Sequence, residues 1–226
     1  MMQLFSYPNA SNMMQALSVQ LVTELSDALT RNGKATLAVP GGSTPGPLFD
    51  LLSLVDFDWA NVTIMLTDER WVSTESPRSN TALIKKRLLV NAAASANYVA
   101  LYKDGFEPAA GATALSKQVE LHLPIDVMVL GMGTDMHTAS LFPGSAGLAW
   151  AQSSKADSVV SMIPVMGDLE PRVTLSANVL EAAIRTHVLI LGDEKKAALI
   201  VAETTAPSEA PIAQFLPNSI VHWSPS

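Results

Sequence analysis

Hydrophobic residues along the chain follow two spacings, one typical of helices and one typical of buried strands. Between residues 12 and 31, apolar side chains such as Leu17, Leu21 and Leu25 recur every three or four positions. That period predicts an amphipathic helix with one face turned to the core. Short, continuous apolar runs such as residues 35–39 instead predict strands buried on both faces.

Residues that cap free backbone groups mark where the helices begin and end. Thr44 followed by Pro45 predicts a helix start, with Thr44 as the N-cap and Pro45 as the first helical residue. Asn32-Gly33 predicts the end of the first helix. The other expected N-caps are Ser11 or Asn12 for the first helix, and Ser79 or Asn80 for a helix over residues 83–88.

Strands and helices alternate along the chain, and this alternation predicts the class of fold. We expect one α/β domain over residues 1–226, in which a mostly parallel sheet is covered by helices on both faces. This is a three-layer, doubly wound arrangement. The expected strands are 35–39, 62–66, 126–130, 186–191 and 220–223, the expected helices after the first two are 83–88, 108–121, 176–184 and 193–202, and the expected extended segments are 159–165 and 172–175.

A glycine-rich stretch, residues 131–144, follows the expected strand at 126–130. Glycine lets the backbone turn sharply and lets a ligand approach it closely. In open α/β sheets, ligands bind beyond the carboxyl ends of the strands, which is where Asp135 and His137 stand. A histidine there can take and return a proton near neutral pH. An isolated Asp-x-His would favour an ordinary loop, but the glycine-rich setting favours a functional site.

A second glycine-rich turn, Gly41-Gly42-Ser43-Thr44, joins the strand at 35–39 to the next helix. Free backbone N–H groups, the helix dipole and two hydroxyls make such a turn a candidate phosphate site. An ordinary capped turn is the alternative. The turn is neither a P-loop nor a dinucleotide fingerprint, because the lysine of the first and the glycine spacing of the second are missing.

Charged residues at strand and helix ends complete the set of candidates. Asp68 and Arg70 follow the strand at 62–66, and Arg70 can hold a carboxylate or phosphate through two parallel hydrogen bonds. A salt bridge between Arg70 and its acidic neighbours is the alternative. Arg172 begins an extended segment, and Lys195 lies in the first turn of a helix. Both could meet a phosphate, although a solvated surface position is the default for a lone basic residue.

Composition narrows the function further. Hydrophobic residues make up 48% of the chain, which allows a large core, and the formal net charge of −7 argues against a general nucleic-acid binder. There is no cysteine, and the amino terminus lacks the pattern of a secretory signal. No apolar stretch is long enough to cross a bilayer. We therefore expect a cytoplasmic protein that binds neither nucleic acid nor membrane, as a monomer or small homo-oligomer.

Two other kinds of site find little support. A serine hydrolase needs Gly-x-Ser-x-Gly, but Pro45 follows Ser43 by two residues and Pro143 precedes Ser145 by two. No histidine pair has the spacing of a metal site, so we expect no metal and no cofactor. The histidines outside the glycine-rich stretch, which we assign to surface or packing roles, are His122, His187 and His222.

These motifs, taken in order, resemble the bacterial-type 6-phosphogluconolactonase family of the glucosamine-6-phosphate isomerase/deaminase-like superfamily. The most specific part is His137 to Gly144, since the related deaminases continue differently after their histidine. The resemblance extends over most of the chain. Its motifs here are Val39-Pro40-Gly41-Gly42-Ser43-Thr44-Pro45, Thr67-Asp68-Glu69-Arg70-Trp71-Val72, Ser79-Asn80, Gly131 to Gly144, Pro171-Arg172-Val173-Thr174-Leu175 and Gly192-Asp193-Glu194-Lys195.

Two residues depart from the loop Gly-Glu-Asp-Gly-His that is usual in this family. Thr134 replaces the glutamate, and Met136 replaces the second glycine. A β-carbon makes positive φ costly. We therefore expect Met136 to avoid positive φ, the loop to take a different shape, and turnover to be slower than usual.

The resemblance implies hydrolysis of 6-phospho-D-glucono-1,5-lactone to 6-phosphogluconate in the oxidative pentose phosphate pathway. For this reaction we propose His137 as general base, Asp135 as the residue that orients either the histidine or the loop, and Arg70 or backbone amides of the glycine-rich loops at the oxyanion. Arg70 could instead join the phosphate site. The alternatives are a glucosamine-6-phosphate deaminase/isomerase and a non-catalytic sugar-phosphate-binding protein. The expected substrate- and phosphate-binding residues are Gly41, Gly42, Ser43, Thr44, Asp68, Arg172 and Lys195.

Overall fold

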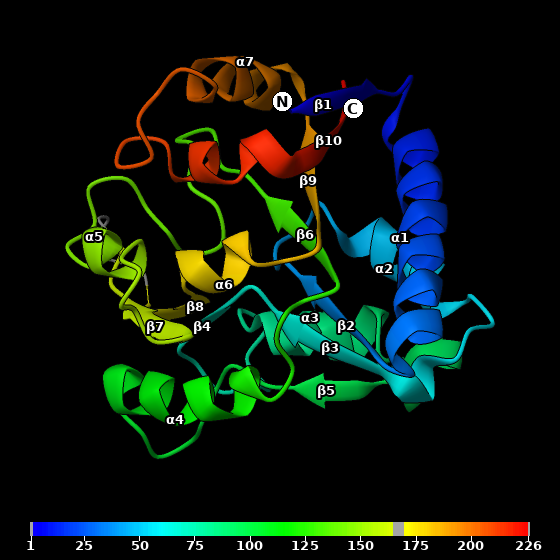
Figure 1. Ribbon diagram of the computed structural model, residues 1–226, viewed down its shortest axis with the longest axis horizontal. Coiled ribbons are helices and arrows are strands. Elements are labelled where there is room, and N and C mark those ends of the chain that lie inside the picture. The colour runs from blue at the N-terminus through cyan, green and yellow to red at the C-terminus, as the bar shows by residue number, and fades with distance from the viewer. Residues whose placement is uncertain (1, 165–169, 226) are drawn as a thin grey trace.

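The computed structural model describes residues 2–164 and 170–225, in which two sheets are joined by helices (Figure 1). All neighbouring strands of the larger, seven-stranded sheet run parallel, in the order β1-β10-β9-β6-β2-β3-β5. The predicted mostly parallel α/β fold is therefore confirmed. Its strands are β1 (Gln3–Ser6), β2 (Ala35–Val39), β3 (Val62–Leu66), β5 (Asn97–Val99), β6 (Val127–Gly131), β9 (Arg185–Leu191) and β10 (Ser219–Ser224).

The path of the chain through this sheet creates a place for a ligand. From β2 the chain moves outward to β3 and β5, then returns to the other side of β2 to form β6. It continues outward through β9 to β10. Between β2 and β6 the connections therefore lead away in opposite directions, and such a switch point leaves a crevice beyond the carboxyl ends of the two strands.

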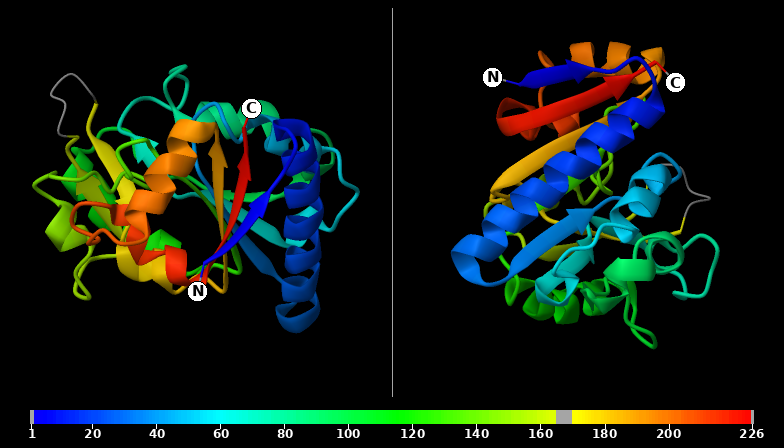
Figure 2. Two further views of the ribbon diagram at one scale, coloured as in Figure 1. Left: turned by 90° about the horizontal axis from the view of Figure 1, so that it is seen from above. Right: turned by 90° about the vertical axis from the view of Figure 1, so that its right-hand side faces the viewer.

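Helices cover both faces of the large sheet. Figure 2 shows α1 on one side of strands β9 and β10 and α7 on the other. The predicted helices are present, and none of the described helices is long and apolar enough to span a membrane. Their bounds are α1 (Ala10–Asn32), α2 (Gly46–Ser53), α3 (Asn80–Arg87), α4 (Pro108–Glu120), α5 (Leu148–Ala151), α6 (Ala177–Glu181) and α7 (Asp193–Ala202).

Two of the expected N-caps are wrong. Helix α1 begins earlier than predicted, because the Asn9 side chain accepts a hydrogen bond from the Asn12 amide at 2.9 Å. Helix α2 has Pro45 at its N-cap position and no side-chain cap, so Thr44 is left outside the helix. The Ser79 cap of α3 is confirmed, since its hydroxyl accepts from the Ala82 amide at 3.2 Å.

A second sheet of three antiparallel strands was not predicted. Its strands are β4 (Asp68–Arg70), β8 (Arg172–Leu175) and β7 (Val159–Met162), in that order. β4 is too short to show a period, and its partners lie far along the chain, so pairing could not be inferred from local sequence. The extended segment expected over 159–165 is a strand only to Met162, and residue 165 lies outside the described residues.

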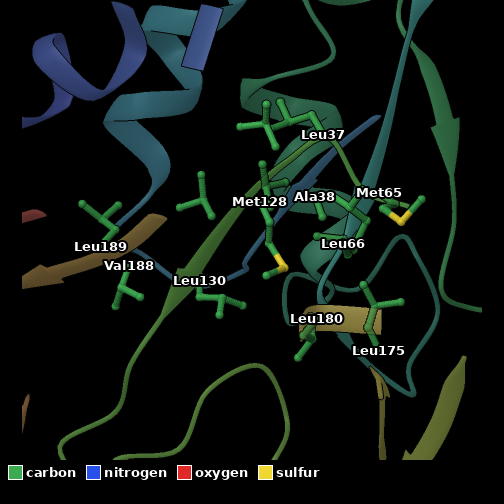
Figure 3. Packing of buried hydrophobic residues seen from close by; sticks show 14 of the residues in the cluster. Leu37, Ala38, Met65, Leu66, Met128, Leu130, Leu175, Leu180, Val188 and Leu189 are labelled. Carbon is green, nitrogen blue, oxygen red and sulfur yellow. The ribbon is translucent and has the colours of Figure 1, made fainter. Parts of the chain in front are cut away.

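One hydrophobic cluster joins the two sheets. Figure 3 shows Leu37 and Ala38 of β2 in this cluster. Leu175 of β8 and Leu180 of α6 belong to the same buried set, with 0% and 1% of their surface exposed. Burial of apolar surface therefore fixes the small sheet against the carboxyl ends of the large one, at about 25 cal/mol for each Å² removed from water.

A chain of hydrogen-bonded polar side chains links the strands β10 and β9 to helix α1. The Tyr7 hydroxyl lies 2.9 Å from His222 Nδ1, His222 Nε2 lies 3.0 Å from His187 Nδ1, and His187 Nε2 lies 2.7 Å from a carboxylate oxygen of Glu24 in α1. Both histidines are fully buried. The packing role predicted for them is therefore confirmed, with a hydrogen-bonded chain added to it.

Candidate active site

The main cleft of the described residues lies where the strands β2, β6 and β9 end, and it has a volume of about 260 Å³. The small antiparallel sheet and the start of α7 close its sides. Every predicted site residue except Asp135 lines this cleft. The residues that line it are Pro40, Gly41, Gly42, Ser43, Thr44, Pro45, Asp68, Arg70, Asn80, Gly131, Met132, Gly133, His137, Ala139, Arg172, Leu189 and Lys195.

The turn after β2 presents backbone amides to the cleft. Gly42 has φ +87°, a conformation that favours glycine. At Gly41 a β-carbon would lie 2.0 Å from Oδ1 of Asn80, so only glycine fits beside this amide side chain. Within the described residues, the backbone amides from Gly41 to Thr44 donate to no other group. They are available to an anion at the start of α2.

The turn after β6 holds an imidazole and a carboxylate together. His137 Nδ1 lies 2.5 Å from Oδ1 of Asp135, and this hydrogen bond is the main reason why the pKa of Asp135 is lowered. Because Nδ1–H donates to the carboxylate, Nε2 is the nitrogen that can accept a proton. No described residue bonds to Nε2. A β-carbon on Gly133 would lie 2.3 Å from both Asp135 Oδ1 and His137 Nδ1, so glycine is needed for the ring to reach this position.

The expectation for Met136 is wrong, because its φ is +65°. Two backbone hydrogen bonds hold it there: its amide donates to the Gly133 carbonyl at 3.0 Å, and its carbonyl accepts from the Ile212 amide at 3.2 Å. A non-glycine residue in the left-handed region costs about 1–2 kcal/mol. The loop therefore keeps a conformation suited to glycine and accepts strain at Met136.

The residues after His137 tie the loop to both sheets. The Thr138 hydroxyl donates to the Gly131 carbonyl at 2.8 Å, which fastens the loop to the end of β6. The Ser140 hydroxyl donates to the Asp68 carboxylate at 2.6 Å, which fastens it to β4. Between them Ala139 has φ +48° and lines the cleft.

Two arginines face each other across the small sheet. Arg70 of β4 and Arg172 of β8 are directly paired in the antiparallel register, so their side chains lie on the same face. The Nε atom of each is buried without a hydrogen-bond partner. Burial and the Arg70 charge lower the pKa of Arg172, and Asp68 approaches its Nη1 only to 3.9 Å. Like charges opposite each other destabilise a sheet, whereas an anion between them would satisfy both donors.

Glu69, the acidic neighbour of Arg70, has a structural role that was not predicted from the sequence. Glu69 is fully buried and accepts hydrogen bonds from the amides of Asn80 at 2.8 Å and Thr81 at 2.7 Å, and from the Ser79 hydroxyl at 3.0 Å. This carboxylate therefore caps α3 instead of pairing with the Arg70 side chain. A carboxylate at a helix N-terminus is favourable, but it comes from a distant strand and gives no local signal.

Lys195 enters the cleft from the first turn of α7. The preceding Gly192 has φ +92°, and its carbonyl accepts a hydrogen bond from Trp223 Nε1 at 3.0 Å. Lys196 Nζ lies 3.5 Å from the centre of the Trp223 ring, and this cation–π contact is a second link between the same turn and Trp223. Burial lowers the pKa of Lys195. This turn is therefore fixed to β10, and Lys195 is the residue that it directs to the cleft.

Asn80 is the polar cleft residue that sequence reasoning left out of the site. It was considered only as a helix cap, but its side-chain amide donates to the Asp68 carbonyl at 2.9 Å and contacts Gly41 closely. It therefore spaces the β2 turn from β4. Its place in the motif beside Ser79 was the one available signal.

Comparison with known proteins gives this arrangement a family. The sequence profile of the family described as glucosamine-6-phosphate isomerases/6-phosphogluconolactonase matches residues 8–223. The chain belongs to this family. The resemblance predicted from the sequence motifs is therefore confirmed, and it covers nearly the whole chain.

Individual members of the family are similar along their whole length. A 6-phosphogluconolactonase of Rhizobium meliloti is 38% identical over 225 residues, which cover 97% of each chain. One of Pseudomonas aeruginosa is 35% identical and covers 96% of this chain and 92% of its own. The crystal structure of a 6-phosphogluconolactonase from Shewanella baltica superposes with a TM-score of 0.94 at 33% identity, covering 99% of this chain and 98% of that one. This superposition covers nearly all residues of both chains, so the similarity extends over the residues of the small antiparallel sheet as well.

Proposed function

We propose that this family member hydrolyses 6-phospho-D-glucono-1,5-lactone to 6-phosphogluconate, the lactonase step of the oxidative pentose phosphate pathway. Relatives named 6-phosphogluconolactonase match it over nearly all of both chains. The observation that carries the proposal is one cleft that holds both a histidine with a free Nε2 and two arginines whose Nε atoms are buried and unpaired. The histidine can act as a base for attack on an ester carbonyl, and the arginines can bind a phosphate.

The chemical step uses His137 as a base and then as an acid. Nε2 takes a proton from water as the oxygen attacks the lactone carbonyl, and it returns that proton to the ring oxygen as the C–O bond breaks. Asp135 holds Nδ1–H, which keeps the tautomer correct and stabilises the imidazolium. The free amides of Gly41 and Gly42 are suited to the developing oxyanion, and one such donor is typically worth about 3–4 kcal/mol.

The phosphate binds at the cationic side of the cleft. We assign it to Arg70 and Arg172, whose side chains share one face of the small sheet, together with Lys195. The hydroxyls of Ser43 and Thr44 complete the set of donors. Arg70 thus belongs with the phosphate rather than the oxyanion in this proposal, because its partner across the sheet is Arg172. Asp68 offsets part of the positive charge and holds the histidine loop through Ser140.

The test is a lactonase assay in which the spontaneous opening of the lactone is subtracted. The phosphorylated lactone is compared with unphosphorylated gluconolactone, and His137→Ala serves as the matched inactive variant. We expect turnover well above the spontaneous rate, a strong preference for the phosphorylated lactone, and loss of the excess rate in the variant. Ammonia release from glucosamine 6-phosphate without lactonase activity would instead support a deaminase. Tight binding of 6-phosphogluconate without turnover would support a non-catalytic binding protein.

A further inference from the structure

One aromatic side chain contacts both halves of the cleft. The Phe142 ring lies 4.8 Å from the His137 imidazole, centre to centre, with the two planes tilted by 40°. The guanidinium carbon of Arg172 lies 5.8 Å from the centre of the same ring. Phe142 does not line the cleft itself, so it stands behind the two residues to which we assign the base and part of the phosphate site.

Backbone hydrogen bonds on both sides of Phe142 fix the position from which its ring projects. The Leu141 amide donates to the Thr138 carbonyl at 2.9 Å, and the Leu141 side chain is fully buried in the core. The Phe142 carbonyl accepts from the Ser145 amide at 3.2 Å, which closes the turn on its other side. The backbone of Phe142 is therefore held between two anchored turns, which keep the residue beside His137.

The His137 ring is held from three directions as a result. The Asp135 carboxylate holds Nδ1, the bare backbone of Gly133 lets the ring approach closely, and Phe142 packs against the imidazole. The hydrogen bond to Asp135 alone leaves the ring free to swing about that contact. The Phe142 ring removes this freedom, and the same ring offers its π-system to the cation of Arg172.

We infer that Phe142 is a positioning residue that sets the separation between the catalytic base and the phosphate-binding guanidinium. This inference rests on the proposed lactonase function. A substrate held by its phosphate presents its carbonyl to His137 only if that separation matches the length of the sugar. Misplacement by about 1 Å can reduce the rate of a reaction about 100-fold.

The experiment compares three variants by kcat and KM on the phosphorylated lactone. We expect Phe142→Leu to lower kcat about 10-fold, through His137, and to raise KM about 3-fold, through Arg172. Phe142→Tyr keeps the ring and should restore both values to within about 2-fold of the parent protein. Phe57→Leu is the matched control, because Phe57 is also a half-buried ring with an aromatic neighbour, Trp59, at 5.4 Å, and it does not line the cleft.

A double variant separates positioning from general loosening of the loop. In an Arg172→Gln background, Phe142→Leu should still lower kcat but should no longer raise KM, because the cation is already gone. An equal effect on KM in both backgrounds, or a Phe142→Leu variant that behaves like Phe57→Leu, would overturn the inference.

The two proposals fail in different ways. If the parent protein is an active lactonase and His137→Ala is not, but Phe142→Leu is unchanged, only the role of Phe142 is wrong. If the parent protein shows no lactonase activity, the proposed function fails. The Phe142–Arg172 contact is then measured by titration with inorganic phosphate. A weakening of about 3-fold in Phe142→Leu supports the contact, and an unchanged affinity contradicts it.

Discussion

Acid should destabilise this protein through the buried histidine chain, well away from the cleft. Burial and the neighbouring His187 lower the pKa of His222 from its ordinary value of 6.5 to about 3, whereas the more distant Glu24 opposes the shift. The neutral form fits the geometry: His187 donates to Glu24, His222 donates to His187, and the Tyr7 hydroxyl donates to His222. Protonation of His222 would reverse this order at Tyr7, since Nδ1 would become a donor and the hydroxyl would have to accept.

Proton linkage gives the direction and the size of this change in stability. Between pH 6.5 and 3 the unfolded chain carries a proton on His222 and the folded chain does not, so stability falls as the pH falls. From pH 6.5 down to pH 5, a span of about 1.5 pH units, only the unfolded state carries this proton. Each of these units lowers the free energy of unfolding by about 1.4 kcal/mol. The expected loss from this one group is therefore about 2 kcal/mol. Glu24 acts in the same direction at lower pH: burial raises its pKa, but its hydrogen bond with His187 and its other polar and charged neighbours together lower it more.

Urea unfolding followed by circular dichroism at pH 8 and pH 5 measures this loss. His222→Gln keeps a hydrogen-bonding side chain without a titrating group, so its stability should change by about 2 kcal/mol less between the two pH values. Tyr7→Phe is the control, because it removes the hydroxyl at His222 Nδ1 but leaves the titrating imidazole. If His222→Gln keeps the full pH dependence of the parent protein, the reasoning about His222 is refuted.

Three further substitutions test the site. His137→Ala should lower kcat about 100-fold or more while the melting temperature stays nearly constant, and near-normal turnover would contradict its role as base. Arg172→Ala should raise KM for the phosphorylated lactone about 10-fold or more and change activity on plain gluconolactone little, which steady-state kinetics on both substrates would show. Met136→Val should unfold at least about 1 kcal/mol more easily than Met136→Gly, because a β-branched residue suits φ +65° least; equal urea midpoints would argue against strain at this position.

The sequence predicts the cleft well because parallel strands end at a common edge. The turns after β2 and β6 each carry glycines at that edge, so Gly41 and His137 could be placed near each other without knowing the sheet order. Each turn also needs its glycine for a local reason, as the close approaches at Gly41 and Gly133 show. Such requirements leave a clear pattern in the sequence.

Long-range polar contacts leave no comparable pattern. Glu69 caps a helix that begins eleven residues later, and His187 bonds to Glu24 from 163 residues away. The spacing of residues does not reveal such pairs, because they depend on which elements pack together. Met136 is a different case. A β-carbon makes its φ of +65° intrinsically unfavourable, but hydrogen bonds to Gly133 and Ile212 hold the residue there, and tertiary structure overrides local preference.

The two sheets contribute different chemistry to one cleft. A parallel sheet buried on both faces offers backbone amides and glycine turns at its edge, because its own side chains are committed to the core. The antiparallel pair β4–β8 instead projects side chains in register, and this is how Arg70 and Arg172 come to share one face. A like-charged pair in that position is unfavourable for folding, and hydrophobic contacts of the small sheet with the core must offset it. The positive charge that an anionic substrate requires is thus placed where it is electrostatically unfavourable for the small sheet, and we therefore attribute this pair to binding.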